Sequence, residues 1–112
     1  MVKSSEIIFH ICLRKDWGTA QESGSYLTDS LESEGFIHCS KADQVAGVAN
    51  FIFKGMEDLV LLHIAVDKIL AELRWEGVEN EIYPHIYGPI NLDAVNMAEK
   101  FPPGVDGVFT YP

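Results

Sequence analysis

The sequence predicts a single small α+β domain that spans residues 1–112, and three observations support this prediction. The length of 112 residues fits one compact domain and leaves no room for two. Strand-like and helix-like segments are mixed, but without the regular strand–helix–strand order of a doubly wound parallel sheet. The composition, with 47% hydrophobic and 22% charged residues, is typical of a globular chain that buries its own core.

The first segments of the chain are predicted to be a strand, a short helix and a connection. Residues 6–12 (EIIFHIC) carry β-branched and aromatic side chains on both faces, which is typical of a central strand. Residues 16–23 then form a short helix, which Asp16 caps and Gly24 ends. A polar connection at residues 26–31 leads to the next strand.

The segment EGFIHCS, residues 34–40, is predicted to be the second strand. Ser40 and Asp43 have the spacing of a pair that caps the N-terminus of a helix. In the helix that follows, apolar residues recur at helical spacing, so one face packs inward. Gly55 is a natural C-terminal stop for this helix.

The second half of the chain is predicted to begin with a buried strand at residues 59–66 (LVLLHIAV), the most hydrophobic run of the sequence. Residues 68–75 follow as a short helix that Asp67 caps, and residues 76–81 follow as a turn. Two prolines bracket the next segment, residues 82–89, which is therefore extended but awkward in the middle of a sheet.

The C-terminal part is predicted to hold one more helix and one more strand. Asn91 can cap a helix over residues 92–100, which ends before the Pro-Pro-Gly run that follows. Residues 105–111 then form a last short strand. No internal repeat and no glycine-rich phosphate loop interrupts this order of elements.

Charge and cysteine content bear on partners and location. The net charge is −9, and the eight lysines and arginines are scattered, which argues against long DNA or RNA as a ligand but not against a small nucleotide. Two cysteines are too few for a disulfide scaffold, and no apolar run is long enough to span a membrane. We therefore expect a cytoplasmic protein with reduced thiols and no membrane partner, and the sequence leaves protein partners and oligomeric state open.

Two histidines in predicted strands, His10 and His38, are the candidate catalytic residues. A single histidine in such a place is more often a core residue that is hydrogen-bonded to the backbone. The pair is different, because each buried polar group left unpaired costs about 1–3 kcal/mol. If the two strands are neighbours, the imidazoles can meet in a cleft at the face of the sheet.

Further side chains are candidate ligand-binding residues, and each has a plain structural alternative. Ser40 either donates to a ligand or only caps a helix. His85 and Tyr87 project to one face of the proline-bracketed segment, which is either a ligand-lining loop or a stiff connection. Glu81 is the carboxylate next to that segment. Candidates for stacking on an aromatic ligand are Trp17, Tyr26 and Phe36.

A metal is not expected, because close pairs such as His-x-x-x-His are absent. Three distant strand histidines could still converge, which keeps a histidine-based, metal-dependent hydrolase as an alternative. Cys39 should point away from His38 on a regular strand, so it is predicted to be a small buried hydrophobe and not a nucleophile. His63 has only apolar company and is predicted to be structural.

Several motifs, in this order, resemble the small bacterial proteins grouped as domain-of-unknown-function family 952. They are IFHI, EGFIHCS with the QVAGVAN helix, DLVLLHI and PHIYGPIN, and the resemblance spans residues 6–107. That family has no established activity. It looks related to the ADP-ribosyltransferase superfamily, whose members bind NAD or ADP-ribose-like groups between two split sheets. The resemblance implies split β-sheets with short flanking helices, and NAD as a candidate substrate.

The same resemblance implies roles for particular residues. His10 matches the first-strand histidine that holds the ribose on the nicotinamide side, and His38 and Ser40 match a strand of the RNA 2′-phosphotransferase branch. The third motif of typical transferases supplies a glutamate that polarises the ribose hydroxyls. The segment YPHIYGP lacks that glutamate, and only Glu81 is nearby. His85 and Tyr87 would contact the base or the leaving group.

Three functions are therefore open, and they predict different observations. An enzyme that processes NAD or a related nucleotide, by glycosyl, ADP-ribosyl or phosphate transfer, needs His10 and His38 to converge with Ser40 in one pocket. A non-catalytic domain that binds a small nucleotide or metabolite would use the same pocket without the glutamate and without turnover. A metal-dependent hydrolase would hold bound metal and would lose it in His10→Ala.

Overall fold

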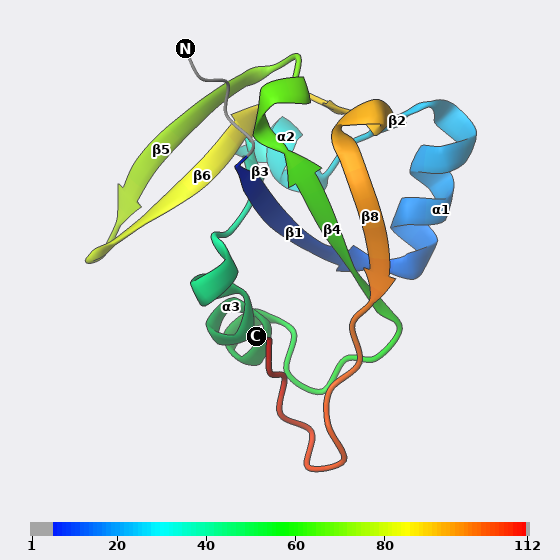
Figure 1. Ribbon diagram of the computed structural model, residues 1–112, viewed down its shortest axis with the longest axis vertical. Helices are drawn as coiled ribbons and strands as arrows, with labels where there is room; N and C mark the ends of the chain where they lie inside the picture. Colours follow the sequence, from blue (N-terminus) through cyan, green and yellow to red (C-terminus); the bar gives the residue numbers. More distant parts are fainter. Residues whose placement is uncertain (1–5, 112) are drawn as a thin grey trace.

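The computed structural model describes residues 6–111, in which short strands and helices follow one another around antiparallel sheets (Figure 1). The strands are β1 (Ile7–Leu13), β2 (Ser25–Tyr26), β3 (Ile37–His38), β4 (Leu59–Ala65), β5 (Glu72–Val78), β6 (Glu81–Tyr87), β7 (Ile90–Asn91) and β8 (Val95–Lys100). The α-helices are α1 (Arg14–Ser23), α2 (Asp29–Ser33) and α3 (Val45–Ile52). Short 3₁₀ turns lie at Ala42–Gln44, Val66–Lys68 and Leu92–Ala94.

The strands form antiparallel sheets in the orders β1-β4-β8, β3-β6-β5 and β2-β7. One isolated bridge, between Phe9 of β1 and Ser40 just after β3, connects the first of these sheets to the second. Its two backbone hydrogen bonds are 2.8 and 2.7 Å long, and beyond it the two sheets separate. The α+β class is confirmed, in the form of several antiparallel sheets with short helices.

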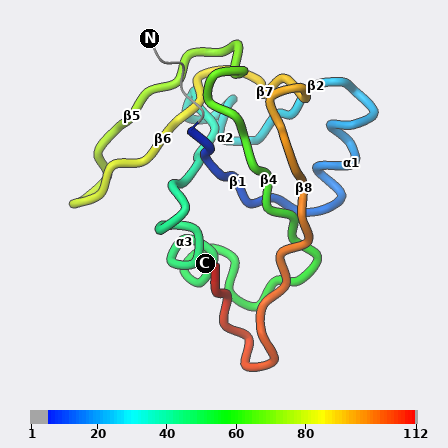
Figure 2. The backbone as a smooth tube through the Cα atoms, in the orientation of Figure 1, coloured from blue at the N-terminus to red at the C-terminus, as the bar shows by residue number. Residues whose placement is uncertain are grey.

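The alternation of side chains along β1 separates two hydrophobic cores. Ile8 and Cys12 belong to the first core, which is shared with α1, β2 and the inward residues of the β3-β6-β5 sheet. Phe9 and Ile11 belong to the second core, which is covered by α3 and the C-terminal segment. The last described residues, red in Figure 2, return to lie beside α3. Burial on both faces is what the sequence predicted for β1.

The first helix ends where the sequence predicted but begins earlier. α1 starts at Arg14, so Asp16 lies in its first turn and does not cap it. Gly24 ends the helix in the left-handed conformation, with φ of 93°, and donates its N–H to the carbonyl of Ala20 at 2.8 Å. Glycine adopts this conformation without the steric penalty that a Cβ atom would add.

The segment predicted as a polar connection at residues 26–31 holds β2 and the start of α2 instead. β2 is hard to recognise in the sequence because it has only two residues and pairs with the distant β7. Thr28 caps α2, since its hydroxyl oxygen accepts a hydrogen bond from the backbone N–H of Leu31 at 3.3 Å.

The predicted cap of the next helix is also wrong. Ser40 is engaged in the bridge to Phe9, so it lies before the helical segment. Gln44 takes the capping role, because its Oε1 accepts a hydrogen bond from the backbone N–H of Lys41 at 2.9 Å. Of the whole EGFIHCS segment, only two residues pair as a strand, and Ser40 adds its bridge.

Two predicted helices are strands. Residues 68–75 were expected to be helical, but the chain makes one 3₁₀ turn and then enters β5; residues 92–100 behave in the same way and form β8. β8 satisfies the backbone groups along the edge of β4, and this long-range pairing overrides the helical preference of Ala, Glu and Lys. β6 is the middle strand of its sheet despite Pro84, whose carbonyl accepts a hydrogen bond from Cys39 N at 3.1 Å.

The strand predicted at residues 105–111 is absent from the described structure, although the segment is held firmly to α3. The side chain of Asn50 accepts from the N–H of Phe109 at 2.8 Å and donates to its carbonyl at 2.9 Å. An amide side chain thus supplies the two hydrogen bonds that a neighbouring strand would have made. Phe109 is 1% exposed in the second core.

Candidate functional site

The imidazole of His10 lies where β1 and β3 separate. Its Nδ1 is 2.6 Å from the backbone carbonyl oxygen of His38, and its Nε2 is 2.8 Å from the hydroxyl of Tyr26. Since a carbonyl can only accept, Nδ1 carries the hydrogen and Nε2 accepts from the tyrosine O–H. The structure therefore joins His10 to the main chain of His38 and not to its imidazole.

Both ring nitrogens of His10 are thus used inside the protein. Burial lowers the pKa of His10 to about 4, an effect that the hydrogen bond to the His38 carbonyl only partly offsets. The ring is neutral at neutral pH, which agrees with the tautomer that its two partners require. A ligand could reach a nitrogen of His10 only by breaking one of these hydrogen bonds.

Of the three residues predicted to stack on an aromatic ligand, Tyr26 and Trp17 lie near His10, whereas Phe36 lies against His85. The rings of His10 and Tyr26 meet edge to face at 5.1 Å, and Trp17 tilts against Tyr26 at 6.4 Å. Burial raises the pKa of Tyr26, and it raises the pKa of Cys12 to about 11. Burial also raises the pKa of Cys39, so neither thiol has the character of a nucleophile.

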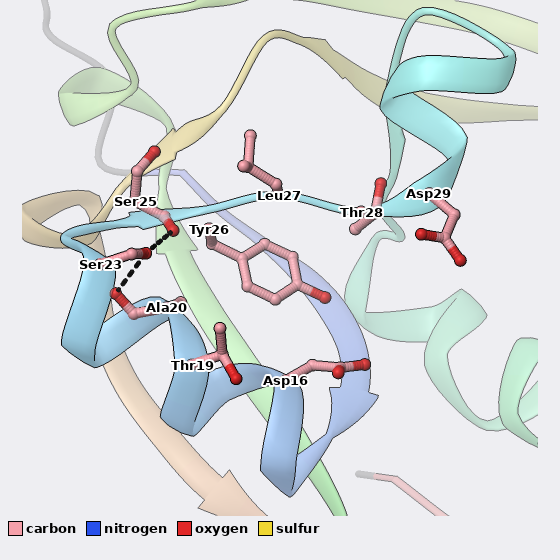
Figure 3. A pocket seen from close by; sticks show the side chains of 9 residues that line it. All are labelled: Asp16, Thr19, Ala20, Ser23, Ser25, Tyr26, Leu27, Thr28 and Asp29. Carbon is pink, nitrogen blue, oxygen red and sulfur yellow. Dashed lines mark hydrogen bonds between the residues drawn. The ribbon is translucent and has the colours of Figure 1, made fainter.

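A hollow of about 260 Å³ lies beside Tyr26 (Figure 3). Tyr26 stands between α1, which carries Asp16 and Thr19, and the segment that carries Thr28 and Asp29. The lining of the hollow is rich in hydroxyl groups and includes the carboxylates of Asp16 and Asp29. The Tyr26 hydroxyl is committed to His10, so the buried tyrosine offers the hollow its ring and not a free donor.

The imidazole of His38 lies on the opposite face of β3 from the first core, because its neighbours Ile37 and Cys39 are both buried in that core. It belongs to a cluster that we call the histidine face. The rings of Phe36 and His38 are 4.8 Å apart, and the rings of His38 and His85 are 5.4 Å apart. The histidine face consists of Glu34, Phe36, His38, Glu76, His85 and Tyr87.

Strand pairing explains why these side chains meet. His38 stands directly opposite His85 across the β3–β6 ladder, so both project from the same face of the sheet. Phe36 stacks on His85 with centroids 4.1 Å apart and an angle of 18° between the rings. Phe36 also lies 5.2 Å from the ring of Tyr87, two residues farther along β6.

Glu76 on β5 is the acidic centre of the histidine face. Its Oε1 accepts hydrogen bonds from the hydroxyl of Tyr87 at 2.6 Å and from Nδ1 of His85 at 2.7 Å. These two hydrogen bonds, chiefly the one from Tyr87, lower the pKa of Glu76, and the same contact raises the pKa of Tyr87. The side chain of Glu76 is 34% exposed, so the group is an ionised carboxylate at the surface.

Two more charged groups complete the picture: Arg74, which borders the histidine face, and Glu34, which belongs to it. Arg74 lies with its guanidinium 4.1 Å from the centre of the Tyr87 ring and pairs with Glu72 at 2.9 Å. Glu34 accepts from Nε2 of His38 at 3.0 Å, in a contact whose two side chains are about half exposed. Each histidine of the face is therefore held by its own carboxylate.

Four side-chain atoms of the histidine face have no hydrogen-bond partner within residues 6–111: Nδ1 of His38, Nε2 of His85, Oε2 of Glu76 and Oε2 of Glu34. His85 is only 3% exposed, yet no fully buried side-chain nitrogen or oxygen in this part of the chain lacks a partner. Nε2 of His85 is therefore not completely enclosed by the protein. These atoms are the ones available to a ligand.

The remaining predicted residues serve the framework. Glu81 accepts from the amide of Gln44 at 2.9 Å, and the same amide donates to the carbonyl of Ile82 at 3.0 Å, which fixes the start of β6. Ser40 is 5% exposed and is held by the bridge to β1. His63 contacts Glu99 at 3.1 Å in the other sheet.

The predicted site residues thus fall into two groups. His10, Tyr26 and Trp17 lie together in and beside the split between the sheets, and His38, His85 and Tyr87 lie together on the histidine face. Sequence analysis overlooked Glu76 because residues 76–81 were predicted to be a turn. The period-two alternation of ELRWEGV was the signal, since it places Arg74 and Glu76 on one face of a strand.

Two searches of the described residues gave negative findings. Within residues 6–111 no group of three or more histidine, cysteine, aspartate or glutamate side chains is placed to hold a metal ion. In the same part of the chain no helix is both long enough and apolar enough to cross a membrane.

Comparison with known proteins places the chain among uncharacterised relatives. The sequence model of a family described as "protein of unknown function (DUF952)" matches residues 11–98. A crystal structure of protein CC0527 from Caulobacter crescentus is 28% identical, with 93% of each chain covered and a TM-score of 0.85. A solution NMR structure of the same protein is 29% identical, covers 91% of this chain and 90% of that one, and has a TM-score of 0.79. No curated protein matches.

Proposed function

The chain belongs to the DUF952 family, and we propose that it binds and processes a small nucleotide on its histidine face. One observation carries this proposal. On this face His38, His85 and Glu76 each keep one side-chain atom that has no hydrogen-bond partner within the described residues, next to the rings of Phe36 and Tyr87. Elsewhere in the described chain, His10 has both ring nitrogens occupied and His63 contacts Glu99 in the other sheet.

The aromatic part of the face suits the base of a nucleotide. Every nucleobase has a flat π-surface, and stacking on an aromatic side chain contributes about 1–3 kcal/mol per base. Phe36 is held against His85 in a fixed orientation, so little side-chain freedom is lost when a second ring approaches. The flanking ring of Tyr87, with Arg74 against it, widens this surface.

The polar part of the face suits the sugar. Ribose hydroxyls both donate and accept, and Oε2 of Glu76 is an acceptor that has no partner in the described part of the chain. Each imidazole donates one N–H to a carboxylate, and its other nitrogen has no partner within the described residues. The face therefore offers a nitrogen of each histidine, together with Oε2 of Glu76, for hydrogen bonds to a sugar.

NAD and ADP-ribose are the first ligands to test, because the motifs resemble those of the ADP-ribosyltransferase superfamily. Glu76 provides a carboxylate that the PHIYGP segment itself lacks, and it does so from the neighbouring strand β5. A carboxylate beside a ribose can stabilise the positive charge that develops when a glycosidic bond breaks. In this proposal Glu76 takes the place that Glu81 was expected to fill.

Binding without turnover is the second candidate, and the state of His10 favours it. The resemblance gives the first-strand histidine a role in holding ribose, but here both of its nitrogens are already bonded within the protein. A domain with this arrangement can still hold a nucleotide on the histidine face. It would not use His10 to do so.

Amide NMR shifts during titration with NAD, ADP-ribose, AMP and nicotinamide test the proposal. We expect saturable shifts centred on Phe36, His38 and His85, which weaken in His38→Ala. His63→Gln is the matched control, because it removes an imidazole from the other sheet and should leave binding unchanged. The absence of saturable shifts with all four compounds would refute a nucleotide site. Binding without any product, followed over a day, would select the non-catalytic candidate.

A further inference from the structure

We infer that His38 and His85 form an acid–base pair that opens the phosphodiester ring of a 2′,3′-cyclic nucleotide. This inference rests on the proposed nucleotide site and names the bond that is broken there. It differs from glycosyl or ADP-ribosyl transfer, in which the phosphates of the ligand stay intact.

The two imidazoles stand as neighbours with complementary free nitrogens. They are directly opposite each other on antiparallel strands, and their ring centroids are 5.4 Å apart at an angle of 75°. Each carboxylate can only accept, so Nε2 of His38 and Nδ1 of His85 carry hydrogens. The nitrogen left for chemistry is therefore Nδ1 on His38 and Nε2 on His85.

A pair of this kind suits a reaction that needs a proton removed at one end and delivered at the other. Attack of water on phosphorus requires a base, and departure of a ribose oxygen requires an acid. Release of nicotinamide from NAD requires neither, because the departing ring is neutral once the bond to ribose has broken. The presence of two anchored imidazoles therefore favours the phosphodiester over the glycosidic bond.

The step balances without a further reactant. Nε2 of neutral His85 removes a proton from water as the water oxygen forms its bond to phosphorus. The bond between phosphorus and one ribose oxygen breaks, and that oxygen takes the proton from Nδ1 of protonated His38. The product is a nucleoside monophosphate with one free hydroxyl. His85 is left protonated and His38 neutral, and proton exchange with water restores the first state.

Neighbouring charges fit this division of roles. Glu34 and Glu76 are positioning residues, since each orients one ring and stabilises it when it is protonated. Glu34 holds the more exposed ring, and an exposed imidazolium meets the leaving oxygen more readily than a buried one. Arg74, which lies opposite His85 on β5, adds a positive charge beside the face, where it pairs with Glu72 and lies over the ring of Tyr87.

The test is hydrolysis of 2′,3′-cyclic AMP by the full chain, followed by ³¹P NMR between about pH 5 and 9. We expect turnover with a bell-shaped dependence of kcat/KM on pH, because one imidazole must be neutral and the other charged. His38→Ala should lower kcat/KM at least about 100-fold and should remove the alkaline limb of the profile. His85→Gln should lower it similarly and remove the acidic limb.

Controls separate this inference from the nucleotide site on which it rests. His63→Gln, purified in the same way, should keep full activity and rules out a contaminating nuclease if His38→Ala is inactive. Because His85 is buried, its variant could lose its fold, and His38→Ala, at an exposed position, decides the matter alone. Saturable binding of AMP without hydrolysis of the cyclic nucleotide would overturn the acid–base pair and leave the nucleotide site standing. Equal rates in wild type and His38→Ala would also overturn it.

Discussion

His10 and His38 are joined by one hydrogen bond, yet the surroundings of their imidazoles are opposite. The ring of His10 fills the split between two sheets, has a partner on each nitrogen and has its pKa lowered to about 4. The ring of His38 lies on the outer face, where its side chain is 54% exposed and one nitrogen has no partner among residues 6–111. The buried imidazole of His10 therefore connects two parts of the fold by hydrogen bonds, whereas the exposed imidazole of His38 keeps a nitrogen that a ligand can reach.

The two histidines differ in the hydrogen-bond partners of their ring nitrogens, and their positions in the sequence do not reveal this difference. Both are strand histidines flanked by apolar residues. Only the structure shows that His10 donates its Nδ1–H to the His38 carbonyl and accepts at Nε2 from the Tyr26 hydroxyl. Variants at these residues therefore test whether His10 is structural and His38 is free to react.

The largest effect is expected for His10→Ala. The substitution leaves the Tyr26 hydroxyl and the His38 carbonyl without a partner in the split and also removes packed ring atoms. We expect the free energy of unfolding to fall by about 2–4 kcal/mol, measured by urea denaturation. His38→Ala, which removes a half-exposed ring, should cost less than about 1 kcal/mol. Equal losses in the two variants would erase the distinction.

The second effect is a dependence of stability on pH. The folded pKa of His10 is about 4, below the ordinary value of 6.5, so the unfolded chain binds more protons between these values. The stabilisation is fully present above pH 6.5 and is lost as the pH falls toward 4, by about 3 kcal/mol. His10→Gln should flatten the profile and His38→Ala should not. An unchanged slope in His10→Gln would contradict the assignment.

A smaller loss is expected for Tyr26→Phe. This variant keeps the buried ring and its contacts with Trp17 and His10, but it leaves Nε2 of His10 without a donor. We expect a loss of about 1–2 kcal/mol in thermal or urea unfolding, together with a shift of the His10 ring signals in NMR. A loss close to zero would mean that water replaces the hydroxyl, and the split would then be wetter than the structure indicates.

The smallest change in stability is expected for Glu76→Gln, which instead tests the histidine face. The amide oxygen can still accept one of the two hydrogen bonds that Glu76 accepts, so unfolding should change by less than about 1 kcal/mol. Affinity for nucleotides, measured by NMR titration, should fall about tenfold, because the free acceptor loses its charge. Glu81→Gln is the matched control on the same hairpin, and its nucleotide affinity should stay at the wild-type level.

The sequence predicted elements well where the local pattern and the long-range pairing agree. β1 and β4 are apolar runs with both faces covered, and each pairs along its length with the other. The prediction failed where the two conflict: residues 92–100 have a helical composition, but the open edge of β4 draws them into β8. A two-residue strand such as β2 has no local pattern at all.

For the candidate site, the sequence by itself determined which residue types are present, and it singled out His10, His38, His85 and Tyr87 among them. The alternation of EGFIHCS also placed Cys39 in the core and His38 outside it, as the structure has it. The tertiary structure alone decided the partners. It set His38 against His85 instead of His10, and it brought Glu76 from β5 to both His85 and Tyr87. The physical reason is that strand register is a long-range property: which residues stand opposite each other depends on how β3, β5 and β6 pair, and no local pattern encodes that pairing.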